Sequence, residues 1–223
     1  MSLELNRLSI YENRGSTEQA KVLISDFSYT VDNGEILTLM GPSGCGKSTL
    51  LSVIAGFLSP DFSYTGELYL QKMPLTNIKP EDRKIGVLFQ DDLLFPHLSV
   101  CENLMLALPN TVKGKQRRVV AQQTLAQLNL SELANKSPQQ TSGGQKARIS
   151  VMRLLLAQPQ AVLLDEPFSK LDKPLRRDFR DWLFDELKQR NLPTILVTHD
   201  GEDSPHDGTT LDWPWTQKDS LNA

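Results

Sequence analysis

The sequence predicts an α/β fold in which a parallel sheet is combined with an N-terminal antiparallel β subdomain and an inserted α-helical subdomain. Three observations lead to this prediction. Short apolar runs bounded by polar or turn residues, which are typical of buried parallel strands, recur at 35–40, 84–89, 161–164 and 194–197. A glycine-rich loop and a helical pattern follow the first of these runs. Three further helical segments separate the second run from the third.

The N-terminal third of the chain is rich in strand signals. Apolar and polar residues alternate from Val22 to Val31, and Asp32-Asn33-Gly34 then offers the residue types of a tight turn. We therefore expect an antiparallel hairpin that turns at 32–34. After the buried strand at 35–40, the segment 47–57 places its apolar residues at helical spacing, which predicts a helix directly behind the glycine-rich loop.

The rest of the chain predicts helices alternating with buried strands. Segments 100–108, 116–128 and 145–157 have helical periodicity, and no convincing strand lies among them. A further helix at 175–187 would place five apolar side chains on one face, which indicates core packing: Leu175, Phe179, Trp182, Leu183 and Leu187. The tail from 201 onward is acidic and turn-rich, and its bulky residues Trp213 and Trp215 could contact either the core or a partner.

A chain of 223 residues is long enough for one large domain with an inserted lobe. We expect a single domain over 1–223. Its core would comprise 1–90 and 158–200 and include the β subdomain, the helical subdomain would span 91–157, and a short tail would follow at 201–223.

Composition argues against several functional classes. The chain has 24 Lys and Arg residues against 27 Asp and Glu residues, a net charge of −3, so no basic surplus points to nucleic acid. No apolar stretch approaches the roughly 20 residues of a membrane span, and the first residues lack the pattern of a secretory signal. Two cysteines, Cys45 and Cys101, make neither a disulfide framework nor a zinc cluster. These features predict a cytoplasmic globular protein with no nucleic-acid partner.

The glycine-rich loop carries the strongest chemical signal. It matches the pattern G-x-x-x-x-G-K-[ST] and is followed by Thr49: Gly41-Pro42-Ser43-Gly44-Cys45-Gly46-Lys47-Ser48. A plain glycine turn is the alternative, but the loop follows a strand and opens a helix, where backbone N–H groups and the helix dipole favour a phosphate. Lys47 would add a point charge, and the Ser48 hydroxyl would ligate Mg²⁺. We therefore predict a P-loop nucleotide site.

A pair of acids follows the apolar strand at 161–164. Asp165 and Glu166 would lie at the carboxyl edge of the sheet, where ligands of open α/β sheets bind. Asp165 suits the shell of Mg²⁺, and Glu166 suits polarising the water that attacks the terminal phosphate. An apolar run followed by two acids is a weak signal by itself, so this interpretation depends on the neighbouring motifs.

The segment Thr141-Ser142-Gly143-Gly144-Gln145 resembles the S-G-G-Q signature of ATP-binding cassette (ABC) ATPases. Gln90, Ser169-Lys170-Leu171-Asp172 and Thr198-His199-Asp200 resemble further motifs of that family, in the family's order. The resemblance covers nearly the whole chain. It implies the ABC ATPase fold, a P-loop NTPase core with the two subdomains described above, and an ATP hydrolase that uses ATP and Mg²⁺.

The resemblance also implies roles for single residues. Gln90 would be the Q-loop residue that reaches toward Mg²⁺ and water, Glu166 the catalytic carboxylate, and His199 the switch residue near the γ-phosphate. Without the resemblance, Gln90 would carry no signal, and a lone histidine such as His199 would more often be a surface or core residue.

A composite site between two subunits is implied by the signature. In the family, the signature residues, here Ser142, Gly143, Gly144 and Gln145, bind the ATP of the opposite subunit, and the D-loop residue, here Asp172, contacts the partner cassette. The hydroxyl, the N–H groups and the dipole of the helix that follows Ser142 suit such a phosphate. One set of motifs in one chain implies a second cassette, in the simplest case a homodimer.

The segment after Gln90 points to a task for the ATPase. Leu93, Leu94 and Phe95 lie in a stretch that resembles the Q-loop exit of prokaryotic importer cassettes for thiamine, ferric iron, polyamines or sulfate, where it lines a groove for the permease. Core packing in the helical subdomain is the alternative. The resemblance implies an importer ATPase on the cytoplasmic face of the membrane, with integral-membrane permease subunits and a periplasmic or extracellular solute-binding protein as partners.

A soluble ABC-type ATPase that acts on a non-transport partner is the alternative function. Such proteins usually have two cassettes in one chain or a long coiled-coil insertion, and neither is evident here.

Three positions depart from the family pattern. Thr141 stands where many members have Leu, and Lys170 occupies a D-loop position that is often small. The aromatic residue that stacks on adenine is not evident. Tyr11 is our candidate, with core packing as an equal alternative, because it lies further upstream of Lys47 than is usual.

Overall fold

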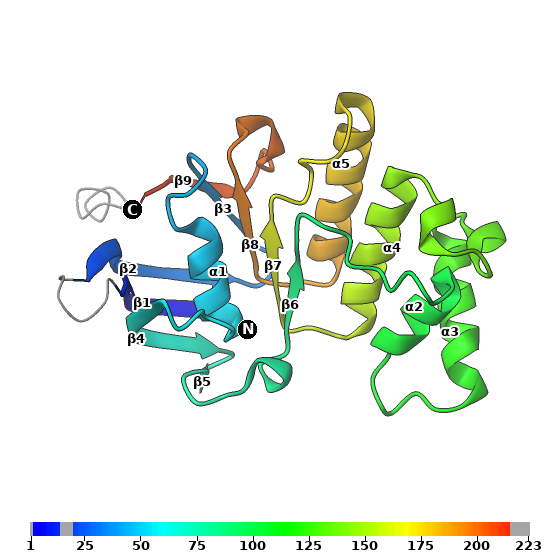
Figure 1. The fold of residues 1–223 in the computed structure, drawn as a ribbon, viewed down its shortest axis with the longest axis horizontal. Coiled ribbons are helices and arrows are strands. Elements are labelled where there is room, and N and C mark those ends of the chain that lie inside the picture. The colour runs from blue at the N-terminus through cyan, green and yellow to red at the C-terminus, as the bar shows by residue number, and fades with distance from the viewer. Residues whose placement is uncertain (1, 14–19, 215–223) are drawn as a thin grey trace. The chain divides into compact units, whose positions relative to one another are not determined.

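The computed structural model describes residues 2–13 and 20–214 (Figure 1). These residues divide into two compact units. The first unit holds the described residues up to Val87, Gln160–Glu166 and those from Asp185 onward. The second holds Leu88–Pro159 and Pro167–Phe184.

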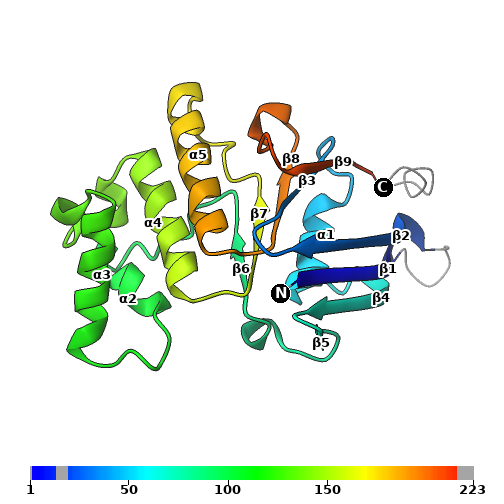
Figure 2. The same ribbon diagram turned by 180° about the vertical axis from the view of Figure 1, so that it is seen from behind.

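The first unit contains an antiparallel sheet near its N-terminus. The strands lie in the order β2-β1-β4-β5, and Figure 2 shows β1 between β2 and β4. Their bounds are β1 (Ser2–Glu12), β2 (Lys21–Asp32), β4 (Phe62–Leu70) and β5 (Met73–Pro74). In β1 the residues Leu3, Leu5, Leu8 and Ile10 are fully buried, because one face of the sheet packs on the core. This sheet is the predicted β subdomain.

The first unit also contains a parallel sheet, with strand order β6-β7-β8-β3-β9; only Leu88, the last residue of β6, is assigned to the second unit. The strands are β3 (Ile36–Met40), β6 (Ile85–Leu88), β7 (Ala161–Asp165), β8 (Thr194–Thr198) and β9 (Thr209–Asp212). Side chains of β3, β7 and β8 are buried on both faces, as expected for strands whose sequences are continuous apolar runs. The mixed α/β class with a parallel sheet is thus confirmed.

Helix α1 (Lys47–Ala55) follows β3 and contacts β7. Gly46 and Gly56 flank it in the left-handed conformation, with φ of 93° and 89°, which glycine adopts without the cost that a Cβ imposes. Leu50, Leu51 and Ile54 are buried in the core of the unit. Short 3₁₀ helices lie at Pro80–Asp82 and Gly201–Asp203.

The predicted hairpin at 32–34 is wrong. Strand β2 pairs with β1, whereas β3 lies in the parallel sheet between β8 and β9. The turn itself forms, since the N–H of Glu35 donates to the Asp32 carbonyl at 3.0 Å, but it carries the chain from one sheet to the other. The reason lies in β3, a continuous apolar run that is buried on both faces and therefore fits a parallel sheet covered on both faces rather than the antiparallel sheet of β2. Strands β1, β4, β5 and β9 were not predicted from the sequence.

The second unit is helical. It contains α2 (Val100–Ala107), α3 (Lys115–Gln127), α4 (Gly143–Leu156), 3₁₀ turns at Ser131–Leu133 and Pro138–Gln140, and the start of α5 (Lys173–Gln189). Helix α2 packs against both α3 and α4. Capping boxes start α2 and α4, at Ser99 with Glu102 and at Ser142 with Gln145, and each satisfies backbone donors that a helix leaves unpaired.

Helix α5 buries the face that its sequence pattern predicts. Phe179, Leu183 and Leu187 are buried, and Leu175 and Trp182 are half-buried. The Phe168 ring packs edge-to-face on Phe179 at 5.9 Å between centroids. None of the helices in the described part of the chain combines the length and the apolar character that a membrane span requires.

Candidate functional site

The glycine-rich loop joins β3 to α1 in the first unit (Figure 1). Gly44 and Gly46 have φ of 79° and 93°, so both positions need the conformational freedom of glycine. The N–H of Leu50 donates to the Gly46 carbonyl at 3.0 Å and starts the hydrogen bonds of α1. The strand, loop and helix thus follow in the order that a phosphate site at a helix N-terminus requires.

Lys47 places a positive charge within this loop. Its ammonium donates to the carbonyls of Gly41 and Pro42, each at 2.7 Å, and lies 3.5 Å from the Cys45 sulfur. The residue is only 4% exposed. In the presence of a phosphate, the phosphate oxygens would replace these two carbonyls as hydrogen-bond acceptors of the Lys47 ammonium, because a charged acceptor makes the stronger hydrogen bond with an ammonium group.

Ser48 and Asp165 meet at the start of α1 and the end of β7. The Ser48 hydroxyl donates to Asp165 Oδ1 at 3.1 Å. Burial raises the pKa of Asp165, and the charge of Glu166 adds to this, whereas the Ser48 hydrogen bond and the charge of Lys47 oppose it. A bound divalent cation would reverse the balance by favouring the ionised carboxylate.

The donor set at this point fits Mg²⁺ rather than a metal held by protein ligands alone. Within the described residues, no group of three or more His, Cys, Asp and Glu side chains is arranged to hold a metal ion. Mg²⁺ takes few protein oxygens and completes its octahedron with water and substrate phosphates. One hydroxyl and one carboxylate beside a phosphate loop are a set of that kind.

Glu166 and His199 lie side by side at the ends of the parallel neighbours β7 and β8. His199 Nδ1 is 3.1 Å from Glu166 Oε1. Glu166 has a positive φ of 47°, an uncommon conformation for a non-glycine residue that is often associated with functional sites. Its N–H donates to the Val197 carbonyl at 3.0 Å, which fixes the backbone against β8. The two predicted residues therefore share one edge of the sheet.

The residues around His199 are anchored by a group that the sequence analysis did not single out. The Thr198 hydroxyl donates to Asp203 Oδ2 at 2.7 Å, and Asp203 is only 2% exposed. The N–H of Asp200 donates to the Thr198 hydroxyl at 3.1 Å. These bonds hold the backbone on both sides of His199. An acid four residues after a histidine is too common a pattern to identify this role from sequence.

The signature residues start α4 in the second unit. The Gln145 N–H donates to the Ser142 hydroxyl at 3.3 Å, and the Ser142 N–H donates to Gln145 Oε1 at 2.9 Å. Ser142 and Gly143 are exposed. A Cβ at Gly143 would meet nothing within 4 Å, whereas at Gly144 it would lie 2.7 Å from Leu175 Cδ2. The helix N-terminus is therefore open at Gly143, where an anion could approach beside the capping box.

Thr141, which departs from the family pattern, is accommodated in the structure. It is buried, at 7% exposure, and its hydroxyl donates to the Pro138 carbonyl at 2.6 Å. The satisfied hydroxyl lets a polar side chain occupy a position that is usually apolar.

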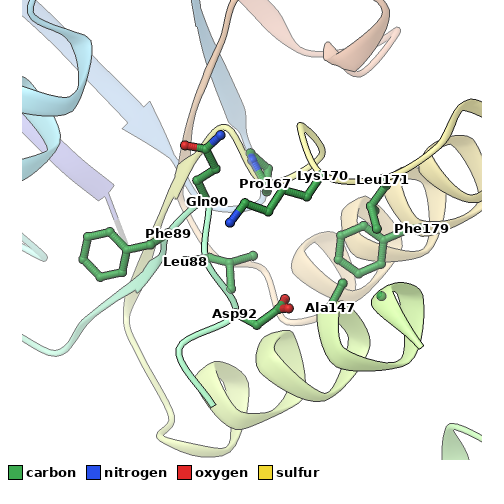
Figure 3. A pocket seen from close by; sticks show the side chains of 10 residues that line it. Leu88, Phe89, Gln90, Asp92, Ala147, Pro167, Lys170, Leu171 and Phe179 are labelled. Atoms are coloured by element: carbon green, nitrogen blue, oxygen red, sulfur yellow. The ribbon is translucent and has the colours of Figure 1, made fainter. Parts of the chain in front are cut away.

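Gln90 lines a small cavity in the second unit, of about 50 Å³ (Figure 3). The lining residues are Leu88, Phe89, Gln90, Asp92, Gly143, Ala147, Pro167, Lys170, Leu171 and Phe179. Lys170, the D-loop residue that departs from the family pattern, forms an ion pair with Asp91. This ion pair connects the D-loop to the segment after Gln90 within the second unit. Burial raises the pKa of Asp92, against the charges of Lys146 and Lys170.

Two further predicted residues lie apart from these groups. Asp172 Oδ1 accepts from the N–H of Leu175 at 3.2 Å, in the first turn of α5 in the second unit. Tyr11 is half-buried on β1, between Val22 of β2 and Ser63 of β4. Gln90, the signature and Asp172 belong to the second unit, and Lys47, Ser48, Asp165, Glu166 and His199 belong to the first.

The segment after Gln90 exposes apolar side chains. Leu93 is 55% and Phe95 43% exposed, so core packing, the alternative for these two residues, is wrong, while Leu94 is half-buried. Hydrogen bonds from two neighbouring helices fix the backbone of this segment. Buried Asn103 accepts from the Phe95 N–H at 2.8 Å, and Arg153 donates to the Leu93 carbonyl at 2.8 Å and lies over the Phe95 ring.

Trp213 contacts the core of the first unit, and Trp215 lies outside the described residues. Trp213 is 3% exposed and belongs to the core cluster that contains Phe27 and Leu39. Its indole N–H donates to the Cys45 carbonyl at 3.0 Å. This contact with the glycine-rich loop had no signal in the sequence, since it depends on the unpredicted strand β9.

Comparison with known proteins agrees with this geometry. The family model described as "ABC transporter" matches residues 24–169. The chain is 50% identical over 190 residues to the uncharacterized ABC transporter ATP-binding protein YnjD of Escherichia coli K12, covering 85% of this chain and 88% of YnjD. It is 35% identical over 204 residues to the thiamine import ATP-binding protein ThiQ of Photobacterium profundum, and the match covers 91% of this chain and 83% of ThiQ.

A longer relative is also similar. The Fe(3+) ions import ATP-binding protein FbpC of Haemophilus influenzae (strain 86-028NP) is 38% identical over 205 residues, covering 89% of this chain but 57% of FbpC. The chain therefore spans little more than half the length of that relative.

Proposed function

The chain belongs to the ABC transporter family of ATP-binding proteins, and from that premise we propose that it is the ATP-hydrolysing subunit of a membrane importer of a small solute or ion. One observation carries the proposal. The first unit combines the phosphate loop and its buried Lys47 ammonium with two side-chain pairs. These are the Ser48 hydroxyl with the Asp165 carboxylate, and the Glu166 carboxylate with the His199 imidazole. The apolar residues next to Gln90 are exposed in the other unit.

Binding of Mg-ATP would begin at the loop. Backbone N–H groups of the loop, the dipole of α1 and the Lys47 ammonium would hold the β- and γ-phosphates. Ser48 and Asp165 would hold Mg²⁺, with Gln90 as a further ligand. The metal, when bound, would neutralise charge that develops on the phosphate oxygens.

Hydrolysis would use Glu166 and His199. A water in line with the γ-phosphate would donate a hydrogen bond to the Glu166 carboxylate, which would accept its proton as the bond from the water oxygen to the γ-phosphorus forms. The bond from the γ-phosphorus to the bridging oxygen would break at the same time, with ADP as the leaving group and inorganic phosphate as the other product. His199, 3.1 Å from Glu166, would orient that carboxylate and contact the γ-phosphate. Both side chains are placed by neighbouring strands, so their separation is fixed before nucleotide arrives.

A second cassette would complete the site. Ser142, Gly143, Gly144 and Gln145 would bind the γ-phosphate held by the partner, and Asp172 would contact the partner across the dimer. Contacts to a γ-phosphate exist only before hydrolysis, so ATP would favour the closed pair and ADP the open one. A homodimer is the simplest arrangement. Tyr11 would stack on adenine.

The exposed apolar pair Leu93 and Phe95 would dock an integral-membrane permease. Apolar side chains held from beneath by Asn103 and Arg153 present a preformed surface, and such patches mark interaction sites. ThiQ and FbpC carry import in their names, which supports the importer role. In such an importer the chain would lie on the cytoplasmic face of the membrane, and a periplasmic or extracellular solute-binding protein would deliver the solute. Nothing observed favours a soluble ATPase with a non-transport partner.

The experiment that tests the proposal is isolation of the full chain from detergent-solubilised membranes, with and without Phe95→Glu. We expect a multispanning protein in fixed proportion with the parent chain and its loss with Phe95→Glu, while Mg-ATP hydrolysis by the purified protein stays at the parental rate. Val119→Glu, which charges another exposed apolar position, on α3, is the matched control and should keep the partner. A parent chain that hydrolyses ATP but brings no membrane protein would refute the importer role.

A further inference from the structure

We propose that Trp213 is a positioning residue of the phosphate loop, so that the residue directly after β9 forms part of the nucleotide site. The inference rests on the proposed nucleotide binding at this loop. It is carried by contacts that Trp213 makes at both ends of the loop, all within the first unit.

The first contact lies where the loop begins. The Trp213 N–H donates to the Met40 carbonyl at 2.6 Å, and this bond extends the pairing of β9 with β3 by one residue. The Trp213 backbone also lies directly against Gly41. A Cβ built at Gly41 would be 2.2 Å from the Trp213 carbonyl oxygen and 3.0 Å from its carbonyl carbon. The first glycine of the loop is therefore needed for this close approach of the chain.

The second contact lies near the end of the loop. The indole N–H of Trp213 donates to the Cys45 carbonyl at 3.0 Å. The peptide bond between Cys45 and Gly46 is planar and trans, so its C=O and N–H point in opposite directions. When the indole fixes the Cys45 carbonyl, it also turns the Gly46 N–H away from the indole. Gly46 is the residue before Lys47, where a phosphate loop uses its N–H groups.

The Trp213 side chain is fixed by burial and by ring packing. It is 3% exposed, and its ring packs edge-to-face on Phe27, with 5.3 Å between centroids. A buried indole has one donor and loses a hydrogen bond if that donor has no partner. The Cys45 carbonyl is that partner, so the indole and the loop constrain each other.

Packing alone is the alternative explanation, and Trp213→Phe separates the two. Phenylalanine keeps an aromatic ring against Phe27 but lacks the N–H that reaches Cys45. If the hydrogen bond positions the loop, nucleotide affinity falls in the folded protein. If Trp213 only fills the core, the midpoint of thermal unfolding falls and nucleotide affinity does not.

The test is titration calorimetry of the full chain with MgADP and with MgATP, together with thermal unfolding. We expect Trp213→Phe to weaken both nucleotides by the same factor, about two- to tenfold, the loss that one neutral hydrogen bond represents. ADP and ATP should respond alike because the Gly46 N–H, which the indole orients, would bind the β-phosphate that the two nucleotides share. Leu211→Ala is the matched control, since Leu211 lies on β9 and packs against the same core without the indole contact.

Parental affinity in Trp213→Phe would overturn the inference, and so would equal weakening in Leu211→Ala. Failure of the parent chain to bind either nucleotide would instead refute the proposed function, so the two failures are distinguishable.

Fluorescence gives a second measurement that leaves Trp213 in place and decides the matter if Trp213→Phe does not fold. The chain has three tryptophans, so a Trp182→Phe, Trp215→Phe double variant retains Trp213 alone. We expect MgADP to change its emission, and Lys47→Ala, which lowers nucleotide binding, to abolish the change. Unchanged emission at saturating MgADP would overturn the inference.

Discussion

Substitution of Gly41 by alanine tests how tightly the start of the phosphate loop is packed. The added Cβ would lie 2.2 Å from the Trp213 carbonyl oxygen and 3.1 Å from the Trp213 Cβ. The first of these is a backbone atom, which cannot rotate away as a flexible side chain can. Ordinary contact therefore requires the two chain segments to separate by about 1 Å.

The energetic consequence follows from the bonds that cross this gap. A separation of that size would break the bond from the Trp213 N–H to Met40, now 2.6 Å, and the bond from the indole to Cys45, now 3.0 Å. Each contributes about 1 kcal/mol, and overpacking of a close-packed core adds about 1–3 kcal/mol. We expect Gly41→Ala to lower the free energy of unfolding by about 3–5 kcal/mol.

The assay is equilibrium unfolding in urea without nucleotide, with Gly143→Ala as the matched control. A Cβ at Gly143 meets nothing within 4 Å, and its φ lies outside the left-handed region, so alanine there should leave stability unchanged or raise it by up to about 1 kcal/mol. A Gly41→Ala protein within about 1 kcal/mol of the parent would refute the packing described here, as would an equal loss in Gly143→Ala.

Three other predictions concern separate parts of the molecule. Glu166→Gln should lower ATP hydrolysis by about 10²–10⁴-fold and accumulate an ATP-bound dimer in size-exclusion chromatography; hydrolysis at the parental rate would remove Glu166 from its role. Alkylation of Cys45, monitored by mass spectrometry with the 2% exposed Cys101 as the unreactive internal control, should block nucleotide binding, and ATP should protect; equal labelling with and without ATP would contradict this. Hydrogen bonds from the Ser99 backbone and side chain lower the pKa of Glu102, so its stabilising contribution is present above its unfolded pKa and is lost as pH falls through its folded pKa. In urea unfolding, Glu102→Gln should therefore be less stable than the parent at pH 7 and approach it in acid; a constant difference across pH would argue against this linkage.

Features that depend on short stretches of sequence were predictable. The helix behind the loop starts at Lys47 as expected and ends at Ala55, before Gly56. Gly56 adopts the left-handed conformation that commonly ends a helix, and this local preference can be read from the sequence. The runs 161–164 and 194–197 form β7 and β8, since a short continuous apolar run bounded by polar residues is typical of a strand covered on both faces. The places of Asp165 and His199 at the ends of these strands then follow from the pattern.

Features that depend on strand pairing were not predictable from short stretches. Alternation from Val22 to Val31 indicates a strand but not its partner, and the turn at 32–34 favoured the wrong neighbour because a turn signal does not say which sheet follows. Strand β9 consists of Thr209–Asp212 and is largely exposed, so it lacks the apolar run of a buried strand. The contact of Trp213 with the loop follows from β9 and was missed with it.

The division of motifs between the two units has a mechanistic consequence. Three groups that would hold the β-phosphate and Mg²⁺ lie in the first unit, Lys47, Ser48 and Asp165, whereas Gln90, the further Mg²⁺ ligand, lies in the second. The γ-phosphate would be contacted by His199 of the first unit and by the signature at Ser142, in the second unit of the partner. Nucleotide affinity should therefore depend mainly on the first unit, and the difference between ATP and ADP on His199 together with the partner's signature. A ligand shifts a conformational equilibrium only by its differential affinity for the two states, so the γ-phosphate, which only ATP supplies, is the group able to drive such a change.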